Sequence, residues 1–273
     1  MNIKIKAIVC IFLIPFFIIG LAACSHITSG EISQIQKNEG ALTNKIREEN
    51  VDNLTVLEIK NQIGSIILKP SDGGHLKVSM DANVKATTKE LAEELANRAQ
   101  LNISKKGNKI RLKAVDEKNQ KKDLFKLKAQ KYRSTTELVI DYTVEVPANL
   151  QDIRISTNTG DIDLQNIKAA FDVNCGVGSI HSSQNIGILG NSNFTVTTGM
   201  VDIKLTELSN TKEVNAKITT GDINILLPQD ARCTIETKGF MQAKEQRVMN
   251  GGGAMVKAKA SMGNVYVTTD SSN

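Results

Sequence analysis

The chain has 273 residues, of which 40% are hydrophobic, so it can bury a sizeable core and is not wholly disordered. Aromatic residues make up only 4% and Trp is absent, which argues against sites built on aromatic stacking with sugars or single-stranded nucleic acid. The formal net charge of +5 is unevenly distributed, because Lys and Arg gather in one segment, residues 105–133.

Residues 1–23 predict a lipoprotein signal peptide. Lys4 and Lys6 form a positively charged start, and an apolar run interrupted by Pro15 follows. The run ends in Leu21-Ala22-Ala23-Cys24, which resembles the bacterial lipobox, so we expect a diacylglycerol and an N-acyl chain on Cys24. Such a lipid would attach the protein to the membrane from outside the cytoplasm, where no nucleic-acid partner is expected. A signal anchor with an incidental cysteine is the alternative.

Residues 24–53 are mostly polar and have no strong period. This composition predicts a flexible tether between the lipid and the folded body. A short amphipathic helix within the segment is the alternative.

Residues 54–147 predict an N-terminal β region with one inserted helix. Apolar residues alternate with polar ones, most clearly in the stretch that ends at Pro147, and an Asp-Gly-Gly turn at 72–74 is a hairpin signal. Residues 87–99 instead carry a single apolar stripe behind a capping box formed by Thr87 and Glu90, which predicts a helix.

A basic insertion, residues 105–133, interrupts this region with twelve Lys or Arg against three Asp or Glu. The simpler interpretation is a solvated loop. The functional interpretation is contact with an anionic surface, either lipid headgroups or an envelope polymer. The residues proposed for this contact are Lys105, Lys106, Lys109, Lys121, Lys122, Lys126, Lys128, Lys131 and Arg133.

Residues 148–273 repeat a glycine that is mostly followed by Asp, Ser or Asn, with apolar residues two apart on both sides, as in "ITTGDINILLP" at 218–228. Period two indicates strands with one buried face. A corner between two such strands needs a positive φ, which Gly adopts at little cost, and a neighbouring Asp can accept bonds from backbone amides. The predicted corner residues, including one outlier before the repeats, are Gly64, Gly160, Asp161, Gly178, Gly199, Gly221, Asp222 and Gly263.

The spacing of these glycines predicts the architecture. Those at 160, 178, 199, 221 and 263 are separated by 18, 21, 22 and 42 residues, and Gly239 partly fills the last interval. A recurrence near 20 residues, with strands and no helices, predicts an all-β fold with a β-solenoid or β-helix-like repeat region. An antiparallel sandwich of hairpins is the alternative. In a stack, Cys175 and Cys233 lie three repeats apart and are expected to be free and mostly buried.

The repeated "TTGDINI"-type units, behind a strand that ends in "YTVEVPANL" and a lipoprotein-like signal, resemble the DUF4097 family. Its members are bacterial cell-envelope proteins often labelled adhesins, with a β-solenoid-like repeat region. The resemblance covers about residues 54–270 and is strongest over 138–228. It implies a fold and says little about activity. The helix and lysine-rich insertion between 87 and 133, and the degenerate repeat around Gly239, depart from the pattern.

The sequence contains no zinc signature, nucleophile elbow, phosphate-binding loop or dinucleotide fingerprint. We therefore expect no enzymatic activity and no metal or further cofactor. The alternative is a glycan-active β-helix enzyme in which repeat-edge carboxylates act as an acid–base pair or bind Ca²⁺. Its candidate residues are Asp161, Asp163, Asp202 and Asp222, for which corner formation or a solvent-facing position is the simpler role.

The sequence thus predicts a non-catalytic lipoprotein of the bacterial cell surface. Its β-repeat scaffold would serve adhesion or the binding and sensing of envelope components. The expected partners are the membrane, through the lipid anchor, and an anionic envelope polymer or another surface protein.

Overall fold

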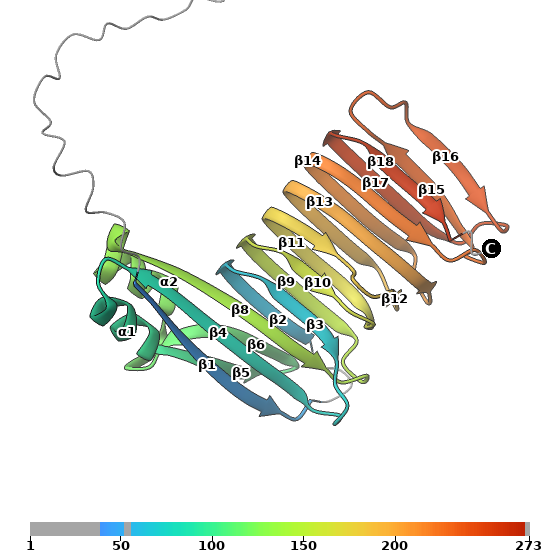
Figure 1. Ribbon diagram of the computed structural model, residues 1–273. Helices are drawn as coiled ribbons and strands as arrows, with labels where there is room; N and C mark the ends of the chain where they lie inside the picture. Colours follow the sequence, from blue (N-terminus) through green and yellow to red (C-terminus); the bar gives the residue numbers. More distant parts are fainter. Residues whose placement is uncertain (1–38, 52–55, 271–273) are drawn as a thin grey trace, which may run out of the picture. The chain divides into compact units, whose positions relative to one another are not determined.

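The structure is a computed structural model that describes residues 39–51 and 56–270 (Figure 1). The predicted signal peptide, Cys24 and the predicted tether up to residue 38 lie outside these residues. Strands dominate the described chain, which confirms the all-β repeat class. Within the described residues, no helix combines the length and apolarity needed to cross a membrane.

Each coil of the stack bends at a glycine and thereby contributes to two layers. Some coils are single strands that run through the bend, namely β11 (Lys168–His181), β13 (Ser192–Leu208) and β14 (Glu213–Leu227). Other coils are pairs of strands on either side of it, namely β2 (Val56–Ile63) with β3 (Ile66–Pro70), β9 (Asp152–Thr159) with β10 (Ile162–Leu164), and β17 (Ala254–Met262) with β18 (Val265–Thr269). We call the strands before the glycines layer A and those after them layer B.

Neighbouring coils pair in parallel in both layers, as a β-solenoid requires and a sandwich of hairpins does not. Antiparallel strands extend both layers at their ends. The additional strands are β1 (Glu39–Glu49), β4 (Leu76–Ala86), β5 (Ala99–Lys106), β6 (Lys109–Asp116), β7 (Asn119–Asp123), β8 (Thr136–Val146), β15 (Cys233–Lys238) and β16 (Glu245–Met249). Layer A then has the order β5-β6-β2-β9-β11-β13-β14-β17-β15-β16, and layer B the order β1-β4-β8-β3-β10-β11-β13-β14-β18. A short strand, β12 (Ile186–Ile188), pairs with the start of β11 and the end of β13.

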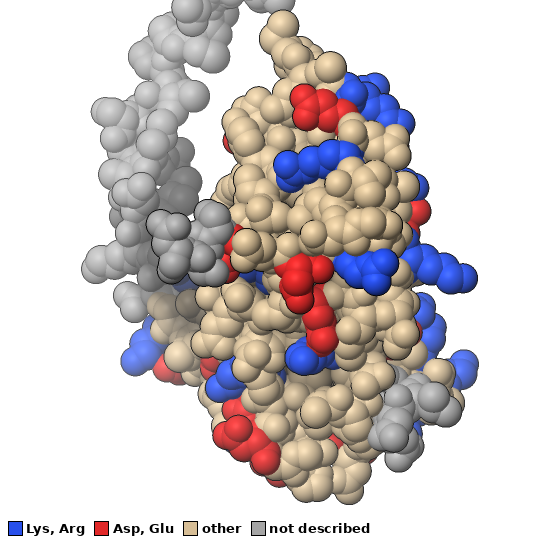
Figure 2. Space-filling view, turned by 90° about the vertical axis from the view of Figure 1, so that its right-hand side faces the viewer, with Lys and Arg blue, Asp and Glu red and all other residues tan. Residues whose placement is uncertain are grey.

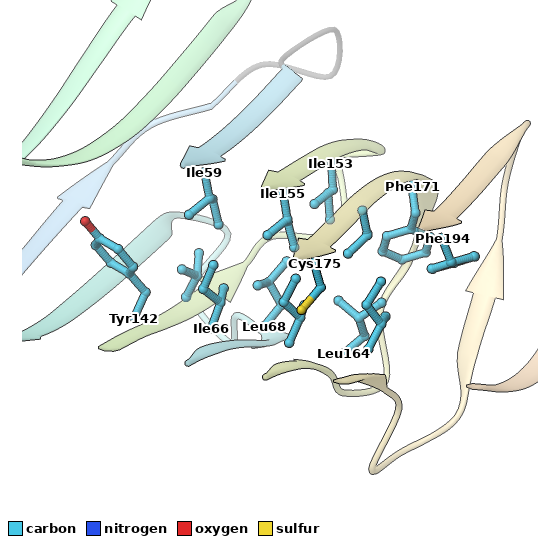
Figure 3. Close-up of a cluster of buried hydrophobic side chains, with 14 of the residues drawn as sticks. Ile59, Ile66, Leu68, Tyr142, Ile153, Ile155, Leu164, Phe171, Cys175 and Phe194 are labelled. Atoms are coloured by element: carbon cyan, nitrogen blue, oxygen red, sulfur yellow. The ribbon is translucent and has the colours of Figure 1, made fainter. Parts of the chain in front are cut away.

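The core lies between the two layers, where alternate residues of most strands point inward (Figure 3). Phe171 and Phe194 stand next to each other on paired strands, with ring centroids 5.9 Å apart. Most of the other positions are filled by Ile, Leu and Val, with Ala as the next most common residue, so the scarcity of aromatic residues does not leave the core empty. Burial of this continuous apolar column is the main favourable contribution to folding.

The predicted tether is wrong over its second half, because residues 39–49 form β1. This strand pairs with β4 along its whole length, from Glu39 opposite Ala86 to Glu49 opposite Leu76. Its inward-facing positions are small or polar, so the alternation is too weak to indicate a strand from sequence alone. The free edge of β4 provides the pairing that the local pattern does not predict.

The predicted helix is present but shorter, as α1 (Lys89–Asn97), and Thr88 rather than Thr87 accepts the capping bond from the backbone of Leu91. The basic insertion is not a loop. It contains the end of β5, then β6 and β7, followed by α2 (Leu124–Leu127) and two short helical turns, η2 (Lys128–Tyr132) and η3 (Arg133–Thr135). Leu124, Phe125 and Leu127 are buried, which fixes these turns to the body.

The last coils are stacked out of chain order. β17 pairs directly with β14, and β15 lies beyond β17, with β16 closing layer A as an antiparallel edge. Gly239 therefore does not fill a place between Gly221 and Gly263, and it is not among the glycines with positive φ. The hairpin that carries β15 and β16 instead covers the C-terminal end of the stack.

Candidate functional site: the repeat corners and the outer face of layer A

The corner glycines form one continuous column. Their φ values lie between +123° and +143°, a region that L residues rarely adopt. A Cβ on any of them would overlap a backbone carbonyl of the preceding coil, which for the first is that of Ile140 and for the others that of the preceding glycine. The column runs in the order Gly64, Gly160, Gly178, Gly199, Gly221, Gly263, so the early outlier Gly64 is its first member.

Carboxylates beside the column hold the corners of adjacent coils together. Asp161 Oδ1 accepts a bond of 2.7 Å from the backbone N–H of Ser179, and Asp222 Oδ1 accepts one of 2.7 Å from that of Asn264. Asp141 does the same for Ser65 at the start of the column, also at 2.7 Å. These bonds account for the preference for Asp next to the glycine without any reactive role.

The acid–base pair required by the enzyme alternative is not assembled. Three coil steps separate Asp161 from Asp222, because Ser179 and Met200 occupy the positions between them. At about 4.8 Å per step the two carboxylates are about 14 Å apart, beyond the roughly 5–9.5 Å that glycosidase pairs use.

Asp163 is buried rather than solvent-facing, with 9% of its surface exposed, which corrects the sequence prediction. It accepts bonds from Gln165 Nε2 (2.6 Å) and from both the N–H and the hydroxyl of Ser183 (2.9 and 2.7 Å). Burial raises its pKa, but these bonds outweigh that effect and the pKa is lowered overall. His181 Nε2 lies 3.5 Å from Asp163 Oδ1. In the strand register, His181 on β11 stands between Asp163 on β10 and Asp202 on β13. No three His, Cys, Asp or Glu among the described residues are arranged to hold a metal ion.

The outer face of layer A is flat and polar, since outward residues of neighbouring strands align in columns. One column alternates in charge, in the order Arg111, Glu58, Arg154, Asp172. Glu58 accepts bonds from Arg111 Nη2 (2.7 Å) and Lys60 Nζ (2.9 Å). The hydrogen bonds from Lys60 and Arg111 lower the pKa of Glu58 to about 2. This part of the face is therefore neutralised internally.

The adjacent column ends in a row of three exposed lysines. Lys217 on β14 lies opposite Lys259 on β17, which in turn lies opposite Lys238 on β15. The column begins with Lys60 on β2, and the strands between carry Ser156, Asn174 and Thr195, which are uncharged. Like charges directly opposite each other on paired strands are destabilising, so the row departs from what stability alone would select.

The structure divides the nine predicted contact residues of the basic insertion into two groups. Lys105, Lys106 and Lys109 lie at the turn between β5 and β6. The second group lies near the other end of β6, about 23 Å away at 3.3 Å per residue. Its members, Lys121, Lys122, Lys126, Lys128, Lys131 and Arg133, form what we call the basic helical end.

The course of the chain distinguishes the two groups further. In the basic helical end, Lys131 is paired with Glu94 of α1 and contacts the ring of Tyr132. The first described residue, Glu39, pairs with Ala86, which pairs with Thr136 next to η3. The chain therefore enters the folded body beside the basic helical end (Figure 1).

Of the two cysteines that lie in the described residues, neither is in a disulfide and both are buried, as predicted. Because of the changed strand order they are four strand steps apart rather than three. Burial raises the pKa of Cys175 to about 11 and also raises that of Cys233. Both are therefore unreactive core residues.

Residues 143–268 match the family described as Toastrack DUF4097. The repeat region has the Toastrack repeat fold. This confirms the resemblance over residues 143–268, and the remainder of the predicted range lies outside the match. The match includes the coils from β9 to β18 with their corner glycines from Gly160 to Gly263, whereas the first coil with Gly64, together with β1, α1 and the basic insertion, precedes it.

Solved structures with a similar arrangement include a "putative cell adhesion protein" from Clostridium sporogenes, with 13% identity, 84% of this chain and 100% of that chain covered, and a TM-score of 0.45. A "putative adhesin" from Parabacteroides merdae has 12% identity, 84% and 95% coverage and a TM-score of 0.27, and one from Bacteroides fragilis has 12% identity, 83% and 97% coverage and a TM-score of 0.25. At TM-scores below 0.5 these similarities carry no argument about function. No curated protein matches the chain.

Proposed function

We propose that this protein is a non-catalytic, adhesin-like scaffold that is anchored to the bacterial membrane by a lipid on Cys24 and binds other envelope components through its outer surfaces. The observation that carries the proposal is the outer face of layer A. It is a long polar surface in cross-strand register, suited to extended contact with a partner, and its lysine row is unneutralised. The carboxylates considered for catalysis are either far apart or engaged with backbone amides.

The place where the chain enters the body supports an orientation on the membrane. A lipid on Cys24 would lie only fifteen residues before Glu39, and Glu39 adjoins the basic helical end. Lysines close to an anionic membrane contribute on the order of 1 kcal/mol each. The basic helical end would then face the lipid, and the Toastrack coils would be stacked away from it.

Lipid attachment is tested by feeding cells an alkyne-tagged palmitate and comparing the wild-type chain with Cys24→Ser. We expect label on the wild type and none on the variant. Label on both, or on neither, would refute the proposed anchor.

The orientation is tested by amide hydrogen exchange on the full chain in nanodiscs of neutral or anionic lipid. We expect residues 119–133 to be more protected in anionic nanodiscs, and the triple variant Lys121→Gln, Lys122→Gln, Lys126→Gln to lose this difference. The matched control is Lys217→Gln, Lys238→Gln, Lys259→Gln, which removes the same charge from the lysine row. Equal loss in both variants would show a net-charge effect only and would contradict the orientation.

Binding by the outer face is tested with the same two variants and an anionic polymer, inorganic polyphosphate, with neutral dextran as control. We expect the lysine-row variant to lose most of the salt-dependent binding and the helical-end variant to keep it. Binding that is equally reduced in both, or absent in the wild type, would remove the lysine row from the proposal.

A further inference from the structure

A gap in layer A lies beside the basic insertion. β2 pairs with β9 over Val56–Ile63 but with β6 only over Val56–Ile59, because β6 then turns away to pair with β7. The edge of β2 from Lys60 to Ile63 therefore faces an opening instead of a strand. Asn61 satisfies part of this edge, since its Oδ1 accepts a bond of 3.0 Å from the N–H of Gln62.

A polar cavity of about 270 Å³ occupies the opening. One of its lining residues is Tyr142, which reaches it from β8 in the opposite layer and is only 1% exposed. The buried Tyr142 hydroxyl has only a loose backbone contact, with Ala114, and no well-formed hydrogen bond within the described protein. Figure 3 shows its oxygen turned away from the aliphatic core. Buried hydroxyl groups are rarely left unpaired, so this one indicates a missing partner in the cavity.

A second cavity of about 340 Å³ lies next to the first and is mainly apolar. It is lined by Ile63, Phe125, Ala129, Leu138 and Val139, with Lys128 and Glu137 at its rim. Ile63 is 43% exposed although it is a large aliphatic residue. Gln62 and Phe125 line both cavities, so the two meet there. Together they form what we call the splay groove.

The charges around the splay groove favour an anion. Lys60, Lys113 and Lys128 line it, against Asp123 and Glu137, and Lys60 is also paired with Glu58 at 2.9 Å. Asp123 is already engaged, because it caps α2 through the N–H groups of Phe125 and Lys126 and lies 3.7 Å from Lys113. The Tyr142 hydroxyl adds a donor inside the groove.

We propose that the splay groove binds an anionic single-chain amphiphile such as a fatty acid. The acyl chain lies in the apolar cavity, and the carboxylate lies in the polar cavity within reach of the Tyr142 hydroxyl and the lysines. The volume of the apolar cavity alone, about 340 Å³, is within the range of pockets that hold small molecules. The polar cavity opens on the outer face of layer A, where Ser156 lines it, three strand steps away from Lys217 of the lysine row. The site does not depend on lipid attachment at Cys24.

Binding is measured by calorimetry on the full chain in phosphatidylcholine nanodiscs, with empty nanodiscs titrated in parallel. We expect saturable binding of decanoate and about fourfold tighter binding for each methylene added from octanoate to decanoate. Decanol, which has the same chain without the charge, should bind at least tenfold more weakly. Equal binding of decanol, or no binding of decanoate beyond the empty nanodiscs, would overturn the proposal.

Two pairs of variants locate the ligand. Ala129→Trp fills the mouth of the apolar cavity and should abolish decanoate binding, whereas Gln130→Trp, an exposed neighbour that lines neither cavity, should leave it unchanged. Tyr142→Phe removes only the hydroxyl. It should weaken decanoate about tenfold, leave decanol unchanged and not lower the unfolding temperature, because the lost hydroxyl is unpaired. Wild-type affinity in both Ala129→Trp and Tyr142→Phe would place the ligand elsewhere and refute the site.

Discussion

The carboxylate of Asp161 lies 2.7 Å from the backbone nitrogen of Ser179, eighteen residues later in the chain and one coil further along the stack. The bond explains why a polar residue follows the glycine at a corner. Asp161→Ala should lower the free energy of unfolding by about 0.5–1.5 kcal/mol, because it removes one backbone partner, and Asp161→Asn should have a smaller effect because its amide oxygen still accepts. Urea unfolding measures both. Asp202→Ala, on the outer face of layer B, is the control, and an equal loss there would contradict the corner role.

The glycine column predicts large effects from the smallest substitution. Gly199→Ala should cost about 2–5 kcal/mol, since its φ is +142° and its Cβ would overlap the carbonyl of Gly178. Gly74→Ala is the matched control. That residue also has a positive φ, +69°, but there is open space around it, so only a backbone cost of about 1 kcal/mol is expected. Equal destabilisation of the two variants would show that the close approach of the coils does not matter.

Arg247 protects the end of layer B. On β16 it lies opposite Ile235 and faces inward, and its guanidinium donates to the carbonyl oxygen of Val267 on the free edge of β18. Gln242 accepts from the N–H of Val265 on the same edge, at 3.0 Å. Inward-pointing charges at sheet edges are a known protection against edge-to-edge pairing.

Arg247→Ala should therefore expose this edge and promote self-association, which sedimentation velocity would detect as a concentration-dependent increase in mass. Arg232→Ala removes the same charge from an exposed position before the hairpin and should leave the mass unchanged. A monomeric Arg247→Ala at concentrations where the wild type is monomeric would argue against the protective role.

Glu58 makes stability dependent on pH in the acid range. Its pKa is about 2 in the folded protein against 4.5 for an ordinary Glu, so its contribution is fully present above about pH 4.5 and is lost as the pH falls through 2. Glu58→Gln should weaken the dependence of the urea midpoint on pH between pH 4.5 and 2. Arg111→Gln should reproduce part of that change. A Glu58→Gln profile that falls as steeply as the wild type would show that other carboxylates are responsible.

The repeat region could be predicted from sequence because its two signals are local. Alternation in strands such as 138–146 shows which face is buried, and a glycine every 20 residues or so shows where the corners are. The features that were missed depend on distant partners. β1 is a strand because β4 offers it an edge, and the position of β15 beyond β17 is set by stacking that spacing does not encode.

The candidate sites divide in the same way. The corner glycines follow from the sequence, but the separation of Lys105 from Lys121 follows from the length of β6 and from where β7 pairs with it. The lysine row consists of residues at regular intervals of 21, yet their spatial order is Lys217, Lys259, Lys238. The splay groove has no sequence signal, because it results from the divergence of β6 from β2 and from a tyrosine on the opposite layer.

The insertion of β17 between β14 and β15 also constrains the order of folding. A ribosome delivers β15 before β17, at a moment when the edge of β14 is still open and could accept the wrong neighbour. The finished arrangement can form only once β17 and β18 have emerged, because β15 needs β17 as its neighbour.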